Sequence, residues 1–529
     1  MKKIVITLSF AVFSIGINNV LHGQVEKKVL NWYNGKGSGM HTEAGYKLLK
    51  GKKSSQVVVA VIDSGIDIEH EDLKGKIWVN NDEIPNNGKD DDNNGYIDDV
   101  NGWNFLGNAN GENVDAATLE KTRILRDLTP KFKDIDPTTL NSSEQEEYKL
   151  YEKVKQEVEE EIANYSQYIP QLQMLPKIIE NVPKKVNEVL GVESYTASDL
   201  KKWKPKTDEE KQLKKLAEAI ESGELSMKAI EEQKKQITDM IDFNLNTEFD
   251  ERKIIGDNPN DLNDKFYGNN NVEGPDALHG THVGGIIAAI RGNELGGDGV
   301  ADNAVLMVLR AVPNGDEHDK DIALAIRYAV DNGAQIINMS FGKSYSTNAK
   351  AVYEAFAYAE SKGVLLVHAA GNSSLNLDQE DHFPTQKYEF QDKPFDLMLT
   401  IGASTRFPKK KLPASFSNYG QTMVDVFAPG YEIYNSVPQS EYQQLNGTSM
   451  ACPMVAGVAA LLKSYFPSLT MKEVKDVILN SAVSYKGKNQ YRPGSKDLVD
   501  FASLSVTGSV VNVKKAIKMC FELEKTKAN

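Results

Sequence analysis

The chain is long, acidic and moderately apolar. It has 529 residues, of which 40% are hydrophobic, and its formal net charge is −14 at pH 7. This apolar content is enough for a large folded core, which excludes an intrinsically disordered chain. The acidic balance argues against nucleic acid as a partner, because binding to phosphates requires a surface rich in Lys and Arg.

The first 23 residues have the pattern of a secretory signal peptide. Two lysines precede a short apolar run that is interrupted at Asn18 and Asn19. We expect cleavage near Gly23 and Gln24, with export to a periplasm or to the extracellular space. A retained membrane anchor is the alternative, but a spanning helix needs about 20 apolar residues. No stable membrane span is expected after cleavage.

Six apolar runs predict buried parallel strands. The first is VVVAVID, from Val57 to Asp63, and the others are AVLMVLRAV, AQIINMSFG, GVLLVHAAGN, LMLTIGAS and MVDVFAPG. Continuous apolar runs are typical of strands that are covered on both faces. Stretches with helical spacing, such as DIALAIRYAVDNG and KAVYEAFAYAESKG, separate several of them. This alternation predicts an α/β sandwich with a mostly parallel central sheet.

A loop with the sequence DDDNNGYIDD has the composition of a calcium site. Asp90, Asp92 and Asn94 stand at alternate positions, followed by Gly95 and Asp98. Oxygen ligands at this spacing are typical of the first half of a calcium-binding loop. The final glutamate of a full loop is missing, and a turn rich in Asn, Asp and Gly without any metal is the alternative. We expect a structural calcium ion here and no catalytic metal.

Residues 108–272 differ in composition from the rest of the chain. They contain 24 basic and 34 acidic residues, which gives this segment a net charge of −10. Apolar residues recur at intervals of three and four, which predicts helices. Three prolines predict that the middle of the segment is divided into short helices, and they are Pro170, Pro176 and Pro183. The segment is expected to be a helical insertion, either functionally idle or regulatory and partner-binding.

The stretch HGTHVGGIIAAI places His279 and His282 at the start of a predicted buried helix. A zinc-binding pair on a helix is usually four residues apart, with a glutamate beside the first histidine, so a metal site is not favoured. Gly284 and Gly285 allow the helix to pack closely against the sheet. His279 is then expected at the sheet edge, where functional groups gather in open α/β folds.

Asp63 and Ser449 can supply the partners that His279 needs. Asp63 ends the first predicted strand, and its carboxylate can orient the imidazole as a general base. Ser449, in NGTSMACPMVAGVAALL, begins a predicted helix whose backbone N–H groups favour developing negative charge. Alone, Ser449 would be interpreted as an N-cap. Together the three residues form an acid, a base and a nucleophile in a chain order known for serine catalysis.

The segments VAVIDSGID, HGTHVGGIIAA and NGTSMACPMVAGVAALL closely resemble the three active-site signatures of the subtilases, the subtilisin-like serine endopeptidases. The resemblance implies a three-layer, subtilisin-like α/β sandwich at residues 24–107 and 273–520. Residues 108–272 would be the insertion and residues 521–529 a C-terminal tail. It also implies that Asp63 orients His279, that His279 is the base and that Ser449 is the nucleophile in the hydrolysis of peptide bonds of proteins through an acyl-enzyme.

The resemblance further implies a substrate-binding cleft. Asn372, in HAAGN, matches the side-chain donor of the oxyanion hole, next to the backbone N–H of Ser449. His282 is implied to be structural. A protein or peptide substrate would lie as an added strand. The residues implied on its two sides are Ser340, Phe341 and Gly342, and Ala369, Ala370 and Gly371.

Two functions from different classes fit these features. The first is an exported serine endopeptidase, and the alternative is a catalytically silent binding protein on a subtilase scaffold that holds a partner with its acidic insertion. Retention of the triad and of Asn372 favours the enzyme. About 39 residues separate the expected cleavage site from Asp63, so we expect no N-terminal pro-domain. The insertion lies between Asp63 and His279 in the chain, and we expect it to cover or control the cleft.

Overall fold

The computed structural model describes residues 29–528, and the predicted signal peptide at residues 1–23 lies outside the described residues. The central sheet has the strand order β10-β13-β7-β6-β5-β4-β1-β3-β2. Neighbouring strands are parallel except for the pair β10 and β13, which confirms the mostly parallel sheet expected from the sequence. The strands are β1 (Val57–Asp63), β2 (Gly102–Asn104), β3 (Ala304–Arg310), β4 (Ile336–Met339), β5 (Leu365–Ala369), β6 (Met398–Ser404), β7 (Val426–Pro429), β10 (Val483–Ser484) and β13 (Ser509–Val510). Two hairpins lie outside this sheet and consist of β8 (Ile433–Val437) with β9 (Glu441–Leu445) and β11 (Asn489–Tyr491) with β12 (Leu498–Asp500).

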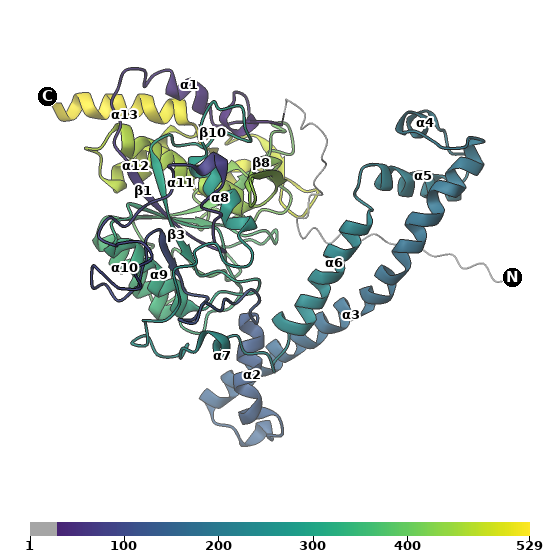
Figure 1. Ribbon diagram of the computed structural model, residues 1–529, viewed down its shortest axis with the longest axis horizontal. Helices are drawn as coiled ribbons and strands as arrows, with labels where there is room; N and C mark the ends of the chain where they lie inside the picture. The colour runs from purple at the N-terminus through teal and green to yellow at the C-terminus, as the bar shows by residue number, and fades with distance from the viewer. Residues whose placement is uncertain (1–28, 529) are drawn as a thin grey trace.

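Strand β1 divides its side chains between two apolar cores. Val57, Val59 and Val61 pack in one core, and Ala60 and Ile62 pack in the other. Successive side chains of a strand point to opposite faces, so helices must cover both faces of the sheet. In Figure 1 the two layers lie on either side of β1 and β3, which confirms the three-layer sandwich. One layer holds α8 (Leu278–Ala288), α11 (Thr448–Tyr465), α12 (Met471–Ser481) and α13 (Val513–Ala528), and the other holds α9 (Asp319–Asp331) and α10 (Ala349–Ser361).

The end of the chain is helical rather than the tail that the sequence predicts for residues 521–529. Helix α13 continues to Ala528 and packs against α12 and the short α1 (Thr42–Tyr46). Its last turns form ion pairs, from Glu524 to Lys52 at 2.9 Å and from Lys527 to Glu473 at 2.7 Å. The charged composition of this segment hid the helix, whose apolar face continues that of the preceding residues.

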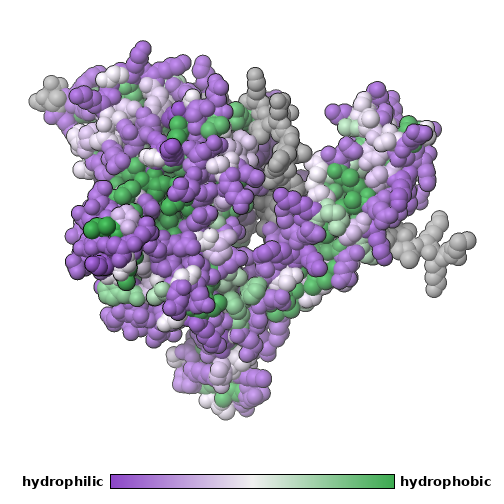
Figure 2. Space-filling view, viewed as in Figure 1, coloured by the Kyte–Doolittle hydropathy of each residue, from purple (hydrophilic) through white to green (hydrophobic). Residues whose placement is uncertain are grey.

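Residues between β2 and α8 form the predicted helical insertion. Its helices are α2 (Glu120–Phe132), α3 (Ser142–Leu190), α4 (Ala197–Lys202), α5 (Asp208–Glu221), α6 (Met227–Asp239) and α7 (Arg252–Ile255), with a π-helical turn at Met240–Asn244. Short 3₁₀ turns occur in the chain at Trp32–Asn34, Glu71–Leu73, Pro137–Thr139 and Phe501–Ser503. Figure 1 shows that α3, α4, α5 and α6 form an arm that extends away from the sheet. In Figure 2 the arm is mostly hydrophilic, with hydrophobic residues where α3 lies beside α5 and α6.

Helix α3 runs without a break from Ser142 to Leu190, so the predicted division into short helices is wrong. The prolines inside it are Pro170, Pro176 and Pro183. A proline within a helix removes a backbone hydrogen bond and crowds the preceding turn, at a cost of about 3 kcal/mol. Tertiary packing offsets this cost, because Val182 and Val186 are buried against α4 and α5. The sequence pattern of α3 alone does not reveal that support.

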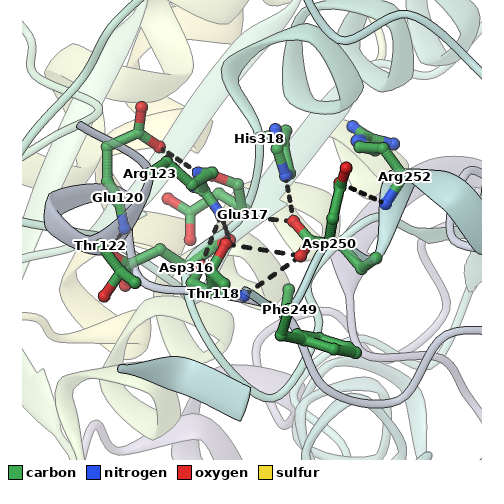
Figure 3. A network of polar contacts seen from close by, with 12 residues as sticks. Thr118, Glu120, Thr122, Arg123, Phe249, Asp250, Arg252, Asp316, Glu317 and His318 are labelled. Atoms are coloured by element: carbon green, nitrogen blue, oxygen red, sulfur yellow. Dashed lines mark hydrogen bonds and ion pairs between the residues drawn. The ribbon is translucent and has the colours of Figure 1, made fainter. Parts of the chain in front are cut away.

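A buried polar network ties the start of the insertion to the sheet domain (Figure 3). The Arg123 guanidinium, on α2, donates to backbone oxygens of Thr118 at 2.5 Å, Asp316 at 3.0 Å and Glu317 at 3.1 Å. Arg123 also pairs with Glu120, and the two side chains are 5% and 2% exposed. The Asp316 carboxylate accepts the backbone N–H of Glu120 at 2.8 Å, which caps the first turn of α2. Because Asp316 and Glu317 immediately precede α9, these bonds fix α2 against the sheet domain.

The last helix of the insertion is anchored in a similar way. Arg252, on α7, pairs with Asp321 of α9 at 2.7 Å and with Asp257 at 3.1 Å. Lys320 of α9 pairs with Asp257 at 2.7 Å. Removing one partner of such a buried pair costs about 3–5 kcal/mol, because the other charge is left uncompensated. Buried charges therefore hold one end of the insertion on the residues just before α9 and the other end on α9 itself.

The Glu317 carboxyl group is buried in this network, and one of its two oxygens is unpaired among the described residues. The side chain is 2% exposed, and its Oε1 atom has no hydrogen-bond partner among residues 29–528. Burial raises the pKa of the Glu317 carboxyl to about 8, although the charge of Lys343 opposes the rise. The ordinary pKa of glutamate is about 4.3, so between these values the folded protein keeps a proton that the unfolded chain releases. The free energy of unfolding is therefore expected to fall as the pH rises through this range.

Replacement of Glu317 by glutamine tests this assignment. Glutamine is neutral at every pH, so Glu317→Gln and the wild-type protein are expected to melt at similar temperatures at pH 5. As the pH rises to 8, the free energy of unfolding of the variant is expected to exceed that of the wild type by a growing amount, up to about 1.4 kcal/mol for each pH unit. The melting temperature of the variant is therefore expected to rise above that of the wild type. Thermal unfolding followed by circular dichroism at pH 5, 6.5 and 8 measures the difference. A difference that does not depend on pH would contradict the assignment.

Candidate active site

Asp63 stands at the carboxyl end of β1, between β3 and β4 in the sheet. Ligands of open α/β sheets bind beyond this edge, where the connections leave in opposite directions. The Asp63 carboxylate is buried, and its Oδ1 atom accepts the backbone N–H of Ser64 at 2.8 Å. Its Oδ2 atom has no hydrogen-bond partner within the described part of the chain. A buried carboxylate with free acceptor capacity favours a positive or proton-donating neighbour.

His279 is that neighbour. Its Nδ1 atom lies 2.7 Å from Asp63 Oδ1, and its side chain is 37% exposed. Burial lowers the pKa of the imidazole, but the charge and the hydrogen bond of Asp63 outweigh burial and raise the pKa above its ordinary value. Gly280 makes the contact possible, because a Cβ atom there would lie 2.0 Å from the Gly65 carbonyl oxygen. Helix α8 can therefore begin directly against the end of β1.

His282 has a separate environment one turn along α8. It is fully buried, and its Nε2 atom lies 3.1 Å from the carbonyl oxygens of both Ile433 and Gln443, in the β8–β9 hairpin. Burial lowers the pKa of its imidazole to about 3, so this side chain is neutral at physiological pH. Its bonds attach α8 to the hairpin, in agreement with a structural role.

Ser449 lies in the first turn of α11 and is half-buried. Its hydroxyl donates to the Ser340 carbonyl at 3.0 Å, and the Ser340 hydroxyl donates to the Ser449 carbonyl at 3.0 Å. The helix begins here because its first backbone N–H groups need acceptors other than helical carbonyls. Asn372 supplies one, because its Oδ1 atom accepts the Thr448 backbone N–H at 2.8 Å. Because this bond holds the Oδ1 side of the amide, the Nδ2 atom of Asn372 lies on the opposite side of the amide group, next to Gly447.

A cavity of about 240 Å³ lies next to Ser449 and Asn372. It is lined by most of the predicted substrate-binding residues, which are Ser340, Phe341, Gly342, Ala369 and Gly371. Ala370 is the exception: it packs in an apolar cluster with Leu412 and Phe427. Side chains alternate along an extended segment, so Ala369 faces one side and Ala370 the other. The prediction that Ala370 forms part of the pocket wall is therefore corrected.

His382 also lines this cavity and was missed in the sequence. Its Nε2 atom is buried without a hydrogen-bond partner among the described residues, which adds a polar group to the lining of the pocket. A Cβ atom on Gly342 would lie 2.5 Å from His382 Nε2, so glycine is needed there. No spacing in the sequence links residue 382 to this wall.

A second cavity of about 390 Å³ lies on the other side of the same segment. Asp63 and His279 line it, and Ser340, Phe341 and Gly342 are shared with the first cavity. The insertion reaches this cavity through Asp115, close to its start. Burial, then the charge of Asp276, raises the pKa of Asp115. Residues 340–342 thus line both the cavity that contains Ser449 and the cavity that contains Asp63 and His279.

The acidic loop brings two of the predicted ligands, Asp90 and Asp92, together with Glu83. One carboxylate oxygen each of Glu83, Asp90 and Asp92 lies within 4.8 Å of the others. Glu83 is 5% exposed, and its Oε2 atom has no hydrogen-bond partner among residues 29–528. Glu83 precedes the loop pattern in the chain, so the pattern did not identify it.

Two predicted ligands of this loop have other partners. The Asp98 carboxylate accepts the backbone N–H groups of Asn87 at 3.1 Å and Gly88 at 2.8 Å. The Asn94 Oδ1 atom accepts the backbone N–H of Tyr96 at 2.7 Å. Such bonds also occur within the cluster, because the Asp90 carboxylate accepts the backbone N–H groups of Asn94 at 3.0 Å and Gly95 at 2.8 Å. Asn94 and Asp98 therefore stay predicted ligands outside the cluster of Glu83, Asp90 and Asp92.

The similar proteins found by comparison are proteases, among them a serine proteinase and a subtilisin. A thermophilic serine proteinase of Bacillus sp. (strain AK1) is 38% identical over 214 residues, which are 40% of this chain and 49% of that protein. Subtilisin DY of Bacillus licheniformis is 35% identical over 217 residues, which are 41% of this chain and 74% of that protein. The chain thus spans about half the length of the first relative. A solved protease structure from Pseudoalteromonas arctica has a TM-score of 0.47 and 18% identity, over 93% of this chain and 97% of that one.

The match to a family as a whole is longer than the matches to single relatives. It extends over residues 54–508, from the residues before β1 to those before β13, and includes the insertion. The family is described as the subtilase family, and the chain belongs to it.

Proposed function

We propose that this protein is a serine endopeptidase that hydrolyses peptide bonds of proteins through an acyl-enzyme. The observation that carries the proposal is the 2.7 Å contact between His279 Nδ1 and Asp63 Oδ1, in a cleft whose other wall holds Ser449. The contact uses Nδ1 and leaves His279 Nε2 to accept a proton. The Asp63 carboxylate orients the imidazole and stabilises the imidazolium that forms.

In the proposed reaction Ser449 is the nucleophile. Its hydroxyl donates to Ser340 in this structure, so it must turn from that carbonyl to His279 before it attacks. The same turn frees the Ser340 carbonyl to accept a hydrogen bond from a substrate backbone. Catalytic hydrogen bonds often align only when substrate is bound. Entry of a peptide therefore prepares the nucleophile and the binding strand in one step.

The oxyanion of the tetrahedral intermediate is assigned to two donors, the Asn372 Nδ2 atom and the Ser449 backbone N–H. The bond from Thr448 to Asn372 Oδ1 supports this role, because it holds the amide in one orientation. Loss of one such donor costs about 10²–10³ in kcat in subtilisin. Substrate is proposed to pair with the segment Ser340–Gly342 as an added strand.

Domain boundaries and export belong to the same proposal. The peptidase domain comprises residues 24–107 and 273–528, and residues 108–272 are the insertion. Residues 1–23 are proposed to direct export to a periplasm or to the extracellular space, from their lysine-then-apolar pattern. Of the helices within residues 29–528, none combines the length and apolarity of a membrane span. The substrates are proteins or peptides.

A fluorophosphonate probe tests the catalytic assignment. The wild-type protein is expected to be labelled at Ser449, and Ser449→Ala is expected to remain unlabelled. Asp63→Asn is expected to label about 10³–10⁴ times more slowly, because His279 loses the carboxylate that orients it. Mass spectrometry of the labelled peptide identifies the site, and Ser373→Ala serves as the control for a serine in the same cavity wall.

Absence of labelling in folded, calcium-loaded wild-type protein would contradict the peptidase. That result would favour the catalytically silent binding protein. Labelling of a serine other than Ser449 would contradict the assignment of the nucleophile.

We also propose a structural calcium ion in the acidic loop, held by Glu83, Asp90 and Asp92. The residues fit such an ion, because a buried Glu83 oxygen lacks a partner among the described residues and the three donors are carboxylate oxygens. The ion would neutralise the mutual repulsion of these groups and stabilise the loop. It takes no part in the proposed reaction.

Calcium dependence of thermal unfolding tests this site. Calcium is expected to raise the melting temperature of the Ser449→Ala protein, which cannot digest itself, and a chelator is expected to lower it. Glu83→Gln and Asp92→Asn are expected to abolish the response. Asp98→Asn is the matched control and is expected to lose stability while keeping the response. A response that survives Glu83→Gln but disappears in Asp98→Asn would contradict the assigned ligands.

A further inference from the structure

Lys343 stands where the two walls of the 240 Å³ cavity meet. It follows Gly342 directly, at the end of the proposed substrate strand. Its backbone exchanges two hydrogen bonds of 2.8 Å with Phe383, the residue after His382. A shift of Lys343 would therefore move both the substrate strand and the His382 wall.

The Lys343 side chain is held by three acceptors from two different parts of the protein. Its Nζ atom lies 2.9 Å from Glu120 Oε2, 2.9 Å from Asp319 Oδ1 and 2.7 Å from the Glu317 carbonyl oxygen. The Lys343 side chain is 1% exposed, and those of Glu120 and Asp319 are 2% and 6% exposed. Glu120 comes from the insertion, whereas Asp319 and Glu317 come from the start of α9. The ammonium group thus bridges the insertion and the sheet domain.

Glu120 is itself fixed in one position. Arg123 pairs with its carboxylate, and the Thr347 hydroxyl donates to its other oxygen. Burial raises the pKa of the Glu120 carboxyl, but the charges of Arg123 and Lys343 outweigh burial and lower the pKa to about 2. The carboxylate therefore stays charged across the physiological range. Figure 3 shows Glu120 and Arg123 at the start of α2, beside Asp316 and Glu317.

We propose that Glu120 is a positioning residue for substrate binding: through Lys343 it holds the segment Ser340–Gly342 and, through Phe383, the opposite wall of the pocket. The inference rests on the proposed function, because it takes this segment as the substrate strand. It assigns to the base of the insertion a role in forming the cleft. The outer part of the arm, which includes Glu180, extends away from the sheet and is not included in this role (Figure 1).

The test compares two glutamates of the insertion in the full-length protein. Glu120→Gln keeps the shape of the side chain and removes the charge that holds Lys343. Glu180→Gln makes the same change in the arm, where Glu180 pairs with Lys184 at 3.0 Å and both side chains are at least 64% exposed. The readouts are kcat and KM for a peptide substrate and the rate of fluorophosphonate labelling, because a small probe does not use the substrate strand.

For Glu120→Gln we expect KM to rise about tenfold, with kcat and the labelling rate within about twofold of wild type. Glu180→Gln is expected to match the wild type in all three. An unchanged KM in folded Glu120→Gln would overturn the inference. A large fall in kcat and in the labelling rate together with a raised KM would also overturn the inference, because these changes would indicate a general loss of structure.

A paired variant keeps the test decisive if Glu120→Gln does not fold. Glu120→Gln combined with Lys343→Met removes both charges, so that no unpaired ammonium remains, and is expected to raise KM to a similar extent. Hydrogen exchange provides a readout that does not depend on activity. Exchange at residues 340–343 and at His382 and Phe383 is expected to be faster in Glu120→Gln than in Glu180→Gln. If the wild type neither cleaves nor labels, the proposed function fails, and equal exchange in the two variants overturns the inference separately.

Discussion

Strand β1 is buried on both faces and ends in a charged residue, and the site depends on how that charge is accommodated. A carboxylate that is removed from water needs hydrogen bonds or an opposite charge. For Asp63 these come from Ser64 and His279, at 2.8 and 2.7 Å. The same contact requires α8 to begin against the strand, which only a glycine at position 280 permits. The orientation of the His279 imidazole therefore depends on how closely α8 packs against β1.

The insertion applies the same principle at the end of β4. Its exposed charges, as in the pair of Glu180 and Lys184, contribute about 0–1 kcal/mol each. Its buried charges have far larger effects, because breaking such a pair costs about 3–5 kcal/mol. The pair of Glu120 and Lys343 belongs to this second kind and stands directly after the segment that lines both cavities. The effect of the insertion on the cleft is thus expected to come from its base and not from its length or net charge.

Much of the fold could be predicted from the sequence because it depends on local patterns. The six apolar runs became β1, β3, β4, β5, β6 and β7, since a strand covered on both faces needs an unbroken apolar sequence. Asp63 and His279 were identified by motif and meet in the structure, whereas Ser449 lines the neighbouring cavity and donates its hydroxyl hydrogen to Ser340. The unbroken α3 was not predictable, because packing against α4 and α5 decides whether a helix tolerates its prolines.

Long-range neighbours account for most of what the sequence did not reveal. His382 reaches the cavity wall from a loop, and Glu83 joins the acidic cluster from outside the loop pattern. The contact between Glu120 and Lys343 joins residues that are more than two hundred positions apart. Ala370 was placed on the wrong face, because its neighbours Ala369 and Gly371 gave no sign of which way each residue points. In each case the missing information is the tertiary partner.

The central claim is that Asp63 orients His279 as a base, and a titration of that histidine tests it most directly. In ¹⁵N-histidine-labelled Ser449→Ala protein, NMR is expected to show His279 titrating above its ordinary pKa of about 6.5. Asp63→Asn in the same background is expected to lower the pKa, because the effect of burial is then opposed only by the charge of Asp276. A pKa at or below about 6.5 with Asp63 present, or one that Asp63→Asn leaves unchanged, would contradict the account.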